Sequence, residues 1–196
     1  VVLIPGCLFT IETRGITADS INCYLSSDGL LTVNNNKRIN LNFWSHDRRT
    51  RIVPRILISV PDSLKVEKLK ITVGAGNLRT KGIKIFANTV NLDVGAGNML
   101  LDSVYGGKLT ARCGMGNLEL KGKLSGSSII DCGMGNVKFY LTGNKDDYSY
   151  DVKVGLGDFR FNDEKKSGVC HVYNNHKKEN HFSVNCGMGS VNIKVE

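Results

Sequence analysis

Three copies of the tetrapeptide Cys-Gly-Met-Gly, which begin at Cys113, Cys132 and Cys186, place a thiol and a thioether two residues apart. Sulfur ligands of this kind bind soft metal ions such as Cu(I). The alternative is structural, because Val, Ala and Leu stand at these positions in other copies of the motif. A buried cysteine behaves as a small hydrophobic residue, and methionine fills gaps in a core. We therefore expect both sulfur side chains in the core, with free thiols and no metal site.

A second group of metal-ligating residue types lies near the C-terminus, where His171, His176 and His181 follow Cys170. A spacing of five residues puts these histidines on a common face of neither a strand nor a helix. Lysines surround them in the sequence: Lys165, Lys166, Lys177 and Lys178. We interpret the segment as a solvated loop.

The third group is basic, and Asp47 is the one acid within it: Lys37, Arg38, Arg48, Arg49, Arg51 and Arg55. A nucleic-acid site would need a recognisable module and interleaved aromatic residues, and only Phe43 and Trp44 are near. We favour a solvated face, with a site for an acidic polymer or lipid as the alternative. The net charge of +8 suits anionic partners such as a glycan, a wall polymer or a membrane surface. The residues expected to contact such a ligand are Arg48, Arg49, Arg51, Arg55, Lys177 and Lys178.

The Gly-x-Gly pairs in the motif differ from a dinucleotide-binding fingerprint, which needs a third glycine three residues on and a following helix. Asp93, Arg112, Asp131 and Lys153 stand at one polar position of successive copies. Opposite charges on neighbouring strands are typical of a structural ladder. Neither paired carboxylates nor a Ser-His-Asp arrangement is evident, so we expect no catalytic residues, no cofactor and no enzyme.

These motifs belong to a repeat that decides the architecture. The corner Val/Cys-Gly-x-Gly-Asn/Asp/Ser recurs six times, with its first glycine at 74, 95, 114, 133, 155 and 187. The intervals are therefore 21, 19, 19, 22 and 32 residues. Apolar residues occupy every second position on both sides of each corner, as Ile130, Cys132, Val137 and Phe139 do, which is the period of a strand. We place the apolar residue between the glycines in the core as well.

One strand–corner–strand copy cannot bury its apolar face alone, whereas stacked copies bury a continuous column. The sequence predicts an all-β fold, a single-stranded β-helix or β-solenoid with coils of about 19–22 residues, right-handed by the general preference of parallel crossovers. Val94, Cys113, Cys132 and Val154 should be buried and stacked in that order. Cys186, two copies away from Cys132, should not reach it.

Two regions are expected. Residues 1–60 lack the glycine corner and form an N-terminal β region of degenerate coils that caps the solenoid. Residues 61–196 form the repeats. The long last interval predicts an inserted loop near residues 162–181, extruded from the solenoid wall.

The chain resembles the putative adhesin family of bacterial β-strand repeat proteins and is similar to the head domains named for a Gly-Ile-Asn (GIN) signature. The repeated corner and the run from Val60 to Leu69 carry the resemblance, which covers residues 58–196 best. It implies a β-helix outside the cell membrane and no catalytic residues.

From these observations we expect a non-enzymatic, extracytoplasmic binding module, a cell-surface adhesin anchored by a segment outside this chain. The alternative is a regulatory ectodomain of a membrane-anchored protein that senses envelope stress. The charge pattern favours no specific nucleic acid as a partner.

Overall fold

The computed structural model describes residues 2–5, 10–14, 21–25, 31–35, 55–174 and 178–196, which are nearly all β-strand. The one helical segment among them is a 3-10 turn, η2 (Lys145–Asp147). Sixteen strands form one sheet, and β3 (Ile21–Leu25) pairs with β4 (Leu31–Asn35) in a separate antiparallel pair. The all-β class predicted from the sequence is confirmed.

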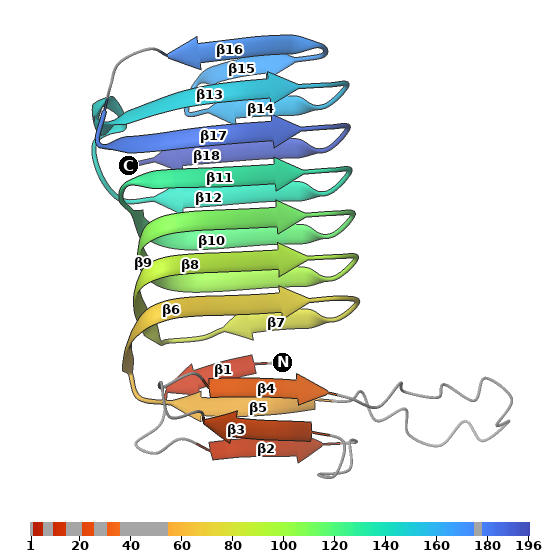
Figure 1. The fold of residues 1–196 in the computed structure, drawn as a ribbon, viewed down its shortest axis with the longest axis vertical. Coiled ribbons are helices and arrows are strands. Elements are labelled where there is room, and N and C mark those ends of the chain that lie inside the picture. Colours follow the sequence, from red (N-terminus) through yellow and green to blue (C-terminus); the bar gives the residue numbers. More distant parts are fainter. Residues whose placement is uncertain (1, 6–9, 15–20, 26–30, 36–54, 175–177) are drawn as a thin grey trace, which may run out of the picture.

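Most of the sheet consists of two layers of parallel strands that are stacked along the long axis and joined by tight corners (Figure 1). In spatial order, the first layer contains β6 (Ser63–Val73), β8 (Lys84–Val94), the end of β9 (Asn98–Cys113), β11 (Ser127–Cys132), β17 (Asn180–Cys186) and β13 (Tyr148–Val154). The second layer contains β7 (Asn77–Thr80), the start of β9, β10 (Asn117–Leu124), β12 (Asn136–Leu141), β18 (Ser190–Val195) and β14 (Asp158–Phe161). We call one corner with its two flanking strands a rung. The solenoid-like stacking follows from this register.

The corners bring the backbones of neighbouring rungs into close contact. The Gly114 N–H donates to the Val94 carbonyl and the Gly133 N–H to the Cys113 carbonyl, both at 2.8 Å. In every corner after the first, the second glycine has no room for a side chain; a Cβ on Gly116, for example, would lie 2.0 Å from the Gly97 carbonyl oxygen. The corner glycines do not adopt positive φ angles. They are required because the rungs approach closely, and not because the bend needs a left-handed backbone.

An asparagine ladder reinforces the corners. The side-chain amide of Asn98 donates to Asn77 at 2.7 Å, that of Asn117 to Asn98 at 2.6 Å, and that of Asn136 to Asn117 at 2.9 Å. Identical amides stacked on adjacent strands form such ladders in other in-register parallel structures. The Asn of the repeat therefore holds neighbouring rungs in register.

The residue between the two corner glycines lies outside the core, which corrects the sequence-based prediction. Met115, Met134, Met188 and Leu156 expose 64%, 54%, 61% and 74% of their surface. The cysteine of each corner is buried as predicted. The alternation of inward and outward side chains is interrupted at the first glycine. Met115 therefore points to solvent, although Cys113, two positions earlier, points into the core.

The order of the rungs also differs from the order of the sequence. Cys186 pairs in register with Cys132 on one side and with Val154 on the other, so the last repeat lies between the fourth and fifth. The predicted order Val94, Cys113, Cys132 holds, but Val154 follows only after Cys186. The expectation that Cys186 would not reach Cys132 is therefore wrong.

The long interval before the last corner contains strands instead of the predicted wall loop near residues 162–181. β15 (Glu164–Ser167) pairs antiparallel with β14, and β16 (Cys170–Asn174) pairs antiparallel with β13. These two strands extend both layers at the far end of the stack (Figure 1). After β12 the chain leaves one rung position empty and forms β13 to β16 at the end of the stack. It then returns, and β17 and β18 occupy the empty position.

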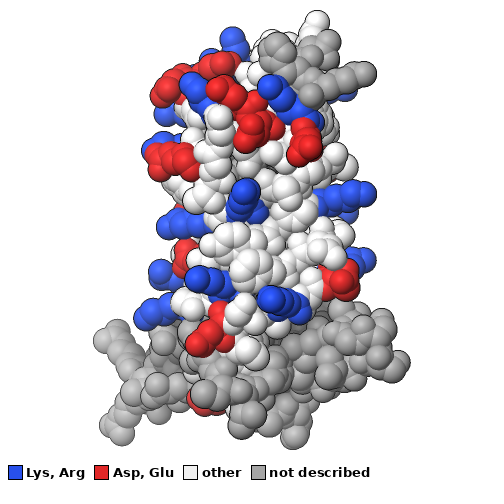
Figure 2. Space-filling view, turned by 90° about the vertical axis from the view of Figure 1, so that its left-hand side faces the viewer, with Lys and Arg blue, Asp and Glu red and all other residues white. Residues whose placement is uncertain are grey.

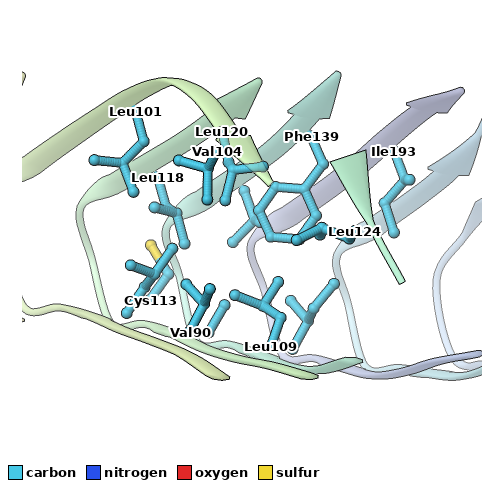
Figure 3. Close-up of a cluster of buried hydrophobic side chains, with 14 of the residues drawn as sticks. Val90, Leu101, Val104, Leu109, Cys113, Leu118, Leu120, Leu124, Phe139 and Ile193 are labelled. Carbon is cyan, nitrogen blue, oxygen red and sulfur yellow. The ribbon is translucent and has the colours of Figure 1, made fainter. Parts of the chain in front are cut away.

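Columns of apolar side chains fill the space between the layers. Phe139, Phe159 and Phe182 are each at most 1% exposed. Figure 3 shows Leu101, Leu118, Leu120, Phe139 and Ile193 converging between the layers. Thr80, the polar exception in its column, is buried, and its hydroxyl accepts a hydrogen bond from the Asp102 N–H at 2.7 Å.

The N-terminal strands continue the sheet beyond the first rung. β1 (Val2–Pro5) pairs in parallel with β7 and with β5 (Arg55–Val60), and β2 (Thr10–Arg14) pairs antiparallel with β5. Ile56, Ile58 and Val60 add to the core. The role of residues 1–60 as a cap stays a prediction.

The corner geometry predicts that Gly116→Ala destabilises the fold by about 1–3 kcal/mol, as overpacking does, because its Cβ would meet the Gly97 carbonyl. Gly76→Ala is the matched control, since a Cβ there meets no atom of the described residues within 4 Å. Urea unfolding of both variants would measure the two free energies. Equal midpoints for the two alanine variants would contradict the proposed contact.

Leu118→Asp should unfold the domain, because an unpaired charge in the buried column costs an energy on the order of the whole stability of a domain. Lys138→Asp, at an exposed outward position, is the control and should keep the fold. Thermal melting followed by circular dichroism separates the two outcomes. A melting temperature unchanged by Leu118→Asp would show that the inward column is misassigned.

Candidate binding surface

The structure describes only two of the six predicted anion contacts, and their role stays a prediction. Four of the six lie outside the described part of the chain: Arg48, Arg49, Arg51 and Lys177. Arg55 begins β5, where the structure describes its backbone alone. Lys178 is described and exposed, just before β17.

Lys178 lines a cavity of about 450 Å³ at the far end of the stack, together with Lys145. Three carboxylates share the lining: Asp146, Asp163 and Glu164. The Tyr150 hydroxyl donates to Glu164 at 2.7 Å, and burial together with this contact raises the pKa of Tyr150 to about 12. The mixed charge makes this cavity a poorer site for a polyanion than the lysine-rich sequence around it predicts.

A larger groove, of about 570 Å³, crosses the wall formed by the beginnings of β6 and β8, the middle of β9 and the end of β10. Four outward side chains form one column across it. The register places Lys65 beside Phe86, Phe86 beside Tyr105, and Tyr105 beside Lys123. Each pair lies on adjacent strands, so the two lysines are three rung spacings apart, about 14 Å.

The centre of this column is an aromatic pair. The rings of Phe86 and Tyr105 are stacked with centroids 4.8 Å apart and an interplanar angle of 14°. Both side chains are half-buried and line the groove. An ammonium group at each end and an apolar centre suit a ligand that combines negative charges with a carbon skeleton.

Glycines form the floor of the groove, and the rim is held by a hydrogen bond. A Cβ on Gly107 would lie 2.5 Å from the Asn88 carbonyl oxygen, and one on Gly106 would lie 2.9 Å from a methyl group of Val90. The side-chain amide of Asn88 donates to Glu67 at 2.6 Å. The strands can therefore pack closely here only where glycine stands.

Basic side chains dominate the face that carries the groove. Figure 2 shows lysine and arginine spread over the middle rungs, while acidic side chains gather near the end formed by β13–β16. Glu67 is the one carboxylate among the lining residues, against Lys65 and Lys123. Lys84 and Lys108 are exposed on neighbouring positions of the same strands. The local potential is positive and favours anions.

Comparison with known proteins identifies the family. The family described as Toastrack DUF4097 matches residues 12–195, nearly the whole chain. The protein belongs to this Toastrack family. No curated protein matches it. Among solved structures, a protein from Clostridium sporogenes described as a putative cell adhesion protein is similar, with 14% identity and a TM-score of 0.40, over 100% of this chain and 87% of the other.

The charge ladder predicted on the Toastrack wall is present in part. Asp93, Arg112 and Asp131 lie on adjacent strands, and the Arg112 Nε is 3.9 Å from Asp131. Asn185 is next and donates to Asp131 at 3.0 Å. Lys153 follows Asn185 and not Asp131, because the last repeat is inserted there.

The predicted histidine group is dispersed. His171 lies on β16, where its Nε2 is 2.7 Å from Asp151, and His181 lies on β17, where its Nδ1 is 2.9 Å from the Ser149 hydroxyl. His176 lies outside the described residues. Within the described ranges no three His, Cys, Asp or Glu side chains come together as a metal site.

The three corner thiols form a buried column and are not oxidised to disulfides. The thiols of Cys113 and Cys132 each donate to the carbonyl three residues on at 3.2 Å, and Cys186 does so at 3.3 Å. The contact between the two thiols lowers the pKa of Cys113 and, together with burial, raises the pKa of Cys132, while burial raises the pKa of Cys186. Because all three are buried, these thiols act as hydrophobic residues with weak donors.

Thiol alkylation should therefore discriminate between the cysteines of the native protein. We expect Cys170, which is half-buried, to react well before Cys113, Cys132 and Cys186, because these three are buried and the reagent cannot reach them in the folded protein. Peptide mass spectrometry after a timed iodoacetamide pulse measures the four rates. Equal labelling in the folded protein would contradict the buried column.

Proposed function

We propose that this Toastrack protein is a non-enzymatic binding module that works outside the cytoplasmic membrane, as an adhesin does, and holds an anionic polymer in the groove of Lys65, Phe86, Tyr105 and Lys123. The observation that carries the proposal is the column of two lysines flanking a stacked aromatic pair. The ammonium groups pair with carboxylate or phosphate groups of the polymer. The ring edges contact its sugar or polyol skeleton.

The chemistry of the groove supports binding without turnover. Glycoside cleavage uses a pair of carboxylates on either side of the scissile bond. The groove is lined by the single carboxylate Glu67, which accepts a hydrogen bond from Asn88. We expect the bound polymer to remain intact.

We propose the location outside the membrane because the sequence resembles bacterial surface repeat proteins. The more specific similarity to the GIN head domains is part of the same proposal. In the described ranges no helix is long and apolar enough to cross a bilayer. A long, open wall binds a polymer through many weak contacts that add along the chain.

Titration with an acidic glycan, polygalacturonate, tests the proposal. Binding should weaken steeply between low and physiological salt, because exposed charges are screened over about 8–10 Å. The double variant Lys65→Ala/Lys123→Ala should bind roughly tenfold more weakly at low salt, since two exposed ion pairs together contribute about 1.4 kcal/mol. Lys138→Ala/Lys153→Ala removes the same charge from the other walls and should bind almost as the unchanged protein does.

A second variant compares the groove with the basic residues predicted from the sequence. It carries alanine at Arg48, Arg49, Arg51, Lys177 and Lys178. A loss in this variant alone would move the site to those residues. Equal binding of neutral dextran, or preference for anionic vesicles over the glycan, would contradict the proposed polymer.

A further inference from the structure

Three methionines form a continuous exposed ridge along the corners. Met115, Met134 and Met188 belong to adjacent rungs, because the Met134 N–H donates to the Gly114 carbonyl at 2.8 Å and the Met188 N–H to the Gly133 carbonyl at 2.9 Å. Each side chain is more than half exposed. In-register parallel strands place their Cα atoms about 4.8 Å apart per rung. The three thioethers are thus neighbours in space although 73 residues separate the first from the last in the sequence (188 − 115).

The fold does not require methionine at this position. Ala75, Ala96 and Leu156 occupy it in the other three rungs, where they are also exposed. An exposed side chain gains little from burial, so packing does not select the thioether. Methionine in three consecutive rungs therefore needs another explanation than packing. The property that methionine has and alanine and leucine lack is the sulfur atom with its lone pairs.

The same three rungs carry the cysteines, but the two sets of sulfur atoms are separated by the corner backbone. The second glycine of the next rung covers each thiol: a Cβ on Gly135 would lie 2.6 Å from the Cys113 sulfur, one on Gly189 would lie 2.7 Å from the Cys132 sulfur, and one on Gly157 would lie 3.1 Å from the Cys186 sulfur. The thiols are therefore closed off from solvent. Only the thioethers of these rungs are accessible to a ligand.

We propose that Met115, Met134 and Met188 bind a soft monovalent metal ion, of which Cu(I) is the physiological example. Thioether ligands select Cu(I) over the hard divalent ions that carboxylates prefer. Metal–sulfur bonds of about 2.3 Å hold two ligand sulfurs at most about 4.6 Å apart, close to one rung spacing. Methionine has three rotatable bonds, so the outer two side chains can turn toward an ion bound above the central Met134.

Silver(I) is a suitable probe, because it has the same charge and softness as Cu(I) and does not change oxidation state in air. The protein has four methionines, and Met99 is buried and serves as an internal control. The chain is labelled with ¹³C at the methionine methyl groups and titrated with Ag(I) while NMR follows the four signals. Thiols also bind silver, so the main titration uses a chain in which valine replaces Cys113, Cys132 and Cys186 and serine replaces Cys7, Cys23 and Cys170.

We expect three methyl signals to shift together and to saturate at one silver ion per chain, while the Met99 signal stays in place. Met134→Leu, which removes the central ligand and copies the residue of the Leu156 rung, should weaken binding at least about tenfold, because the outer thioethers then lose their shared ion. Leu156→Met extends the ridge by one rung and should keep the affinity or raise it.

Three signals that shift independently, with a separate ion for each, would overturn the proposal, as would a shift of Met99 alone or no shift at all. If the cysteine-free chain does not fold, the unchanged chain provides the test. There, silver beyond the amount that fills the accessible thiols should move the same three signals, and Met134→Leu should remove one bound silver ion. Identical silver stoichiometry with and without Met134→Leu would contradict the site.

Discussion

The contact of backbone on backbone at the glycine corners is the constraint on which the rest of this structure depends. A Cβ on the second glycine would lie within 2.0–2.3 Å of a carbonyl oxygen in the neighbouring rung for Gly97, Gly116, Gly135, Gly157 and Gly189. Corner hydrogen bonds of about the same length on each rung then fix the register. A shift of the register by one residue would turn every side chain of a strand to the other face of the sheet. This register therefore determines which columns lie in the core and which lie on the surface.

Both candidate ligand surfaces are consequences of that register. In the groove, it aligns Lys65, Phe86, Tyr105 and Lys123, which come from four adjacent strands. At the corners, it aligns three methionines of which none is near another in the sequence. In a solenoid, the same position of each repeat lies in one column on the surface. Changes of residue type at that position can therefore create a ligand-binding column without any change in the core.

Much of the fold could be predicted from the sequence because the repeat is regular. The two-residue period gave the strands, and the buried column of Cys113 and Cys132 is as predicted. The exposure of Met134 could not be inferred, because the inward side changes within the corner and the period-two pattern stops there. The position of Cys186 could not be inferred either, since pairing with a distant strand leaves no local pattern. Right-handed winding stays a prediction.

The candidate site was missed for a different reason. The columns compared in the sequence ended close to the corners, whereas Phe86 and Tyr105 lie farther along each coil. Tyr105 and Lys123 also lie beyond a bulge between Leu120 and Gly122, which shifts the alignment of β10 with β9. Charge counting instead directed attention to residues 48–55 and 165–178, where lysines and arginines are dense in sequence. In the cavity that Lys178 lines, carboxylates from other strands lie nearby and offset its charge. A local count of charges in the sequence cannot show such neighbours.

Amide hydrogen exchange of the native protein tests the central claim most directly, because it reports how each rung is covered by its neighbours. If the last repeat lies between the fourth and fifth, the amides of β17 and β18 should be as protected as those of β11 and β12, and the slowest exchange should be found in the middle of the spatial order. If the rungs instead follow the sequence, β17 and β18 would lie at the end of the stack and exchange first, and that result would contradict the structure.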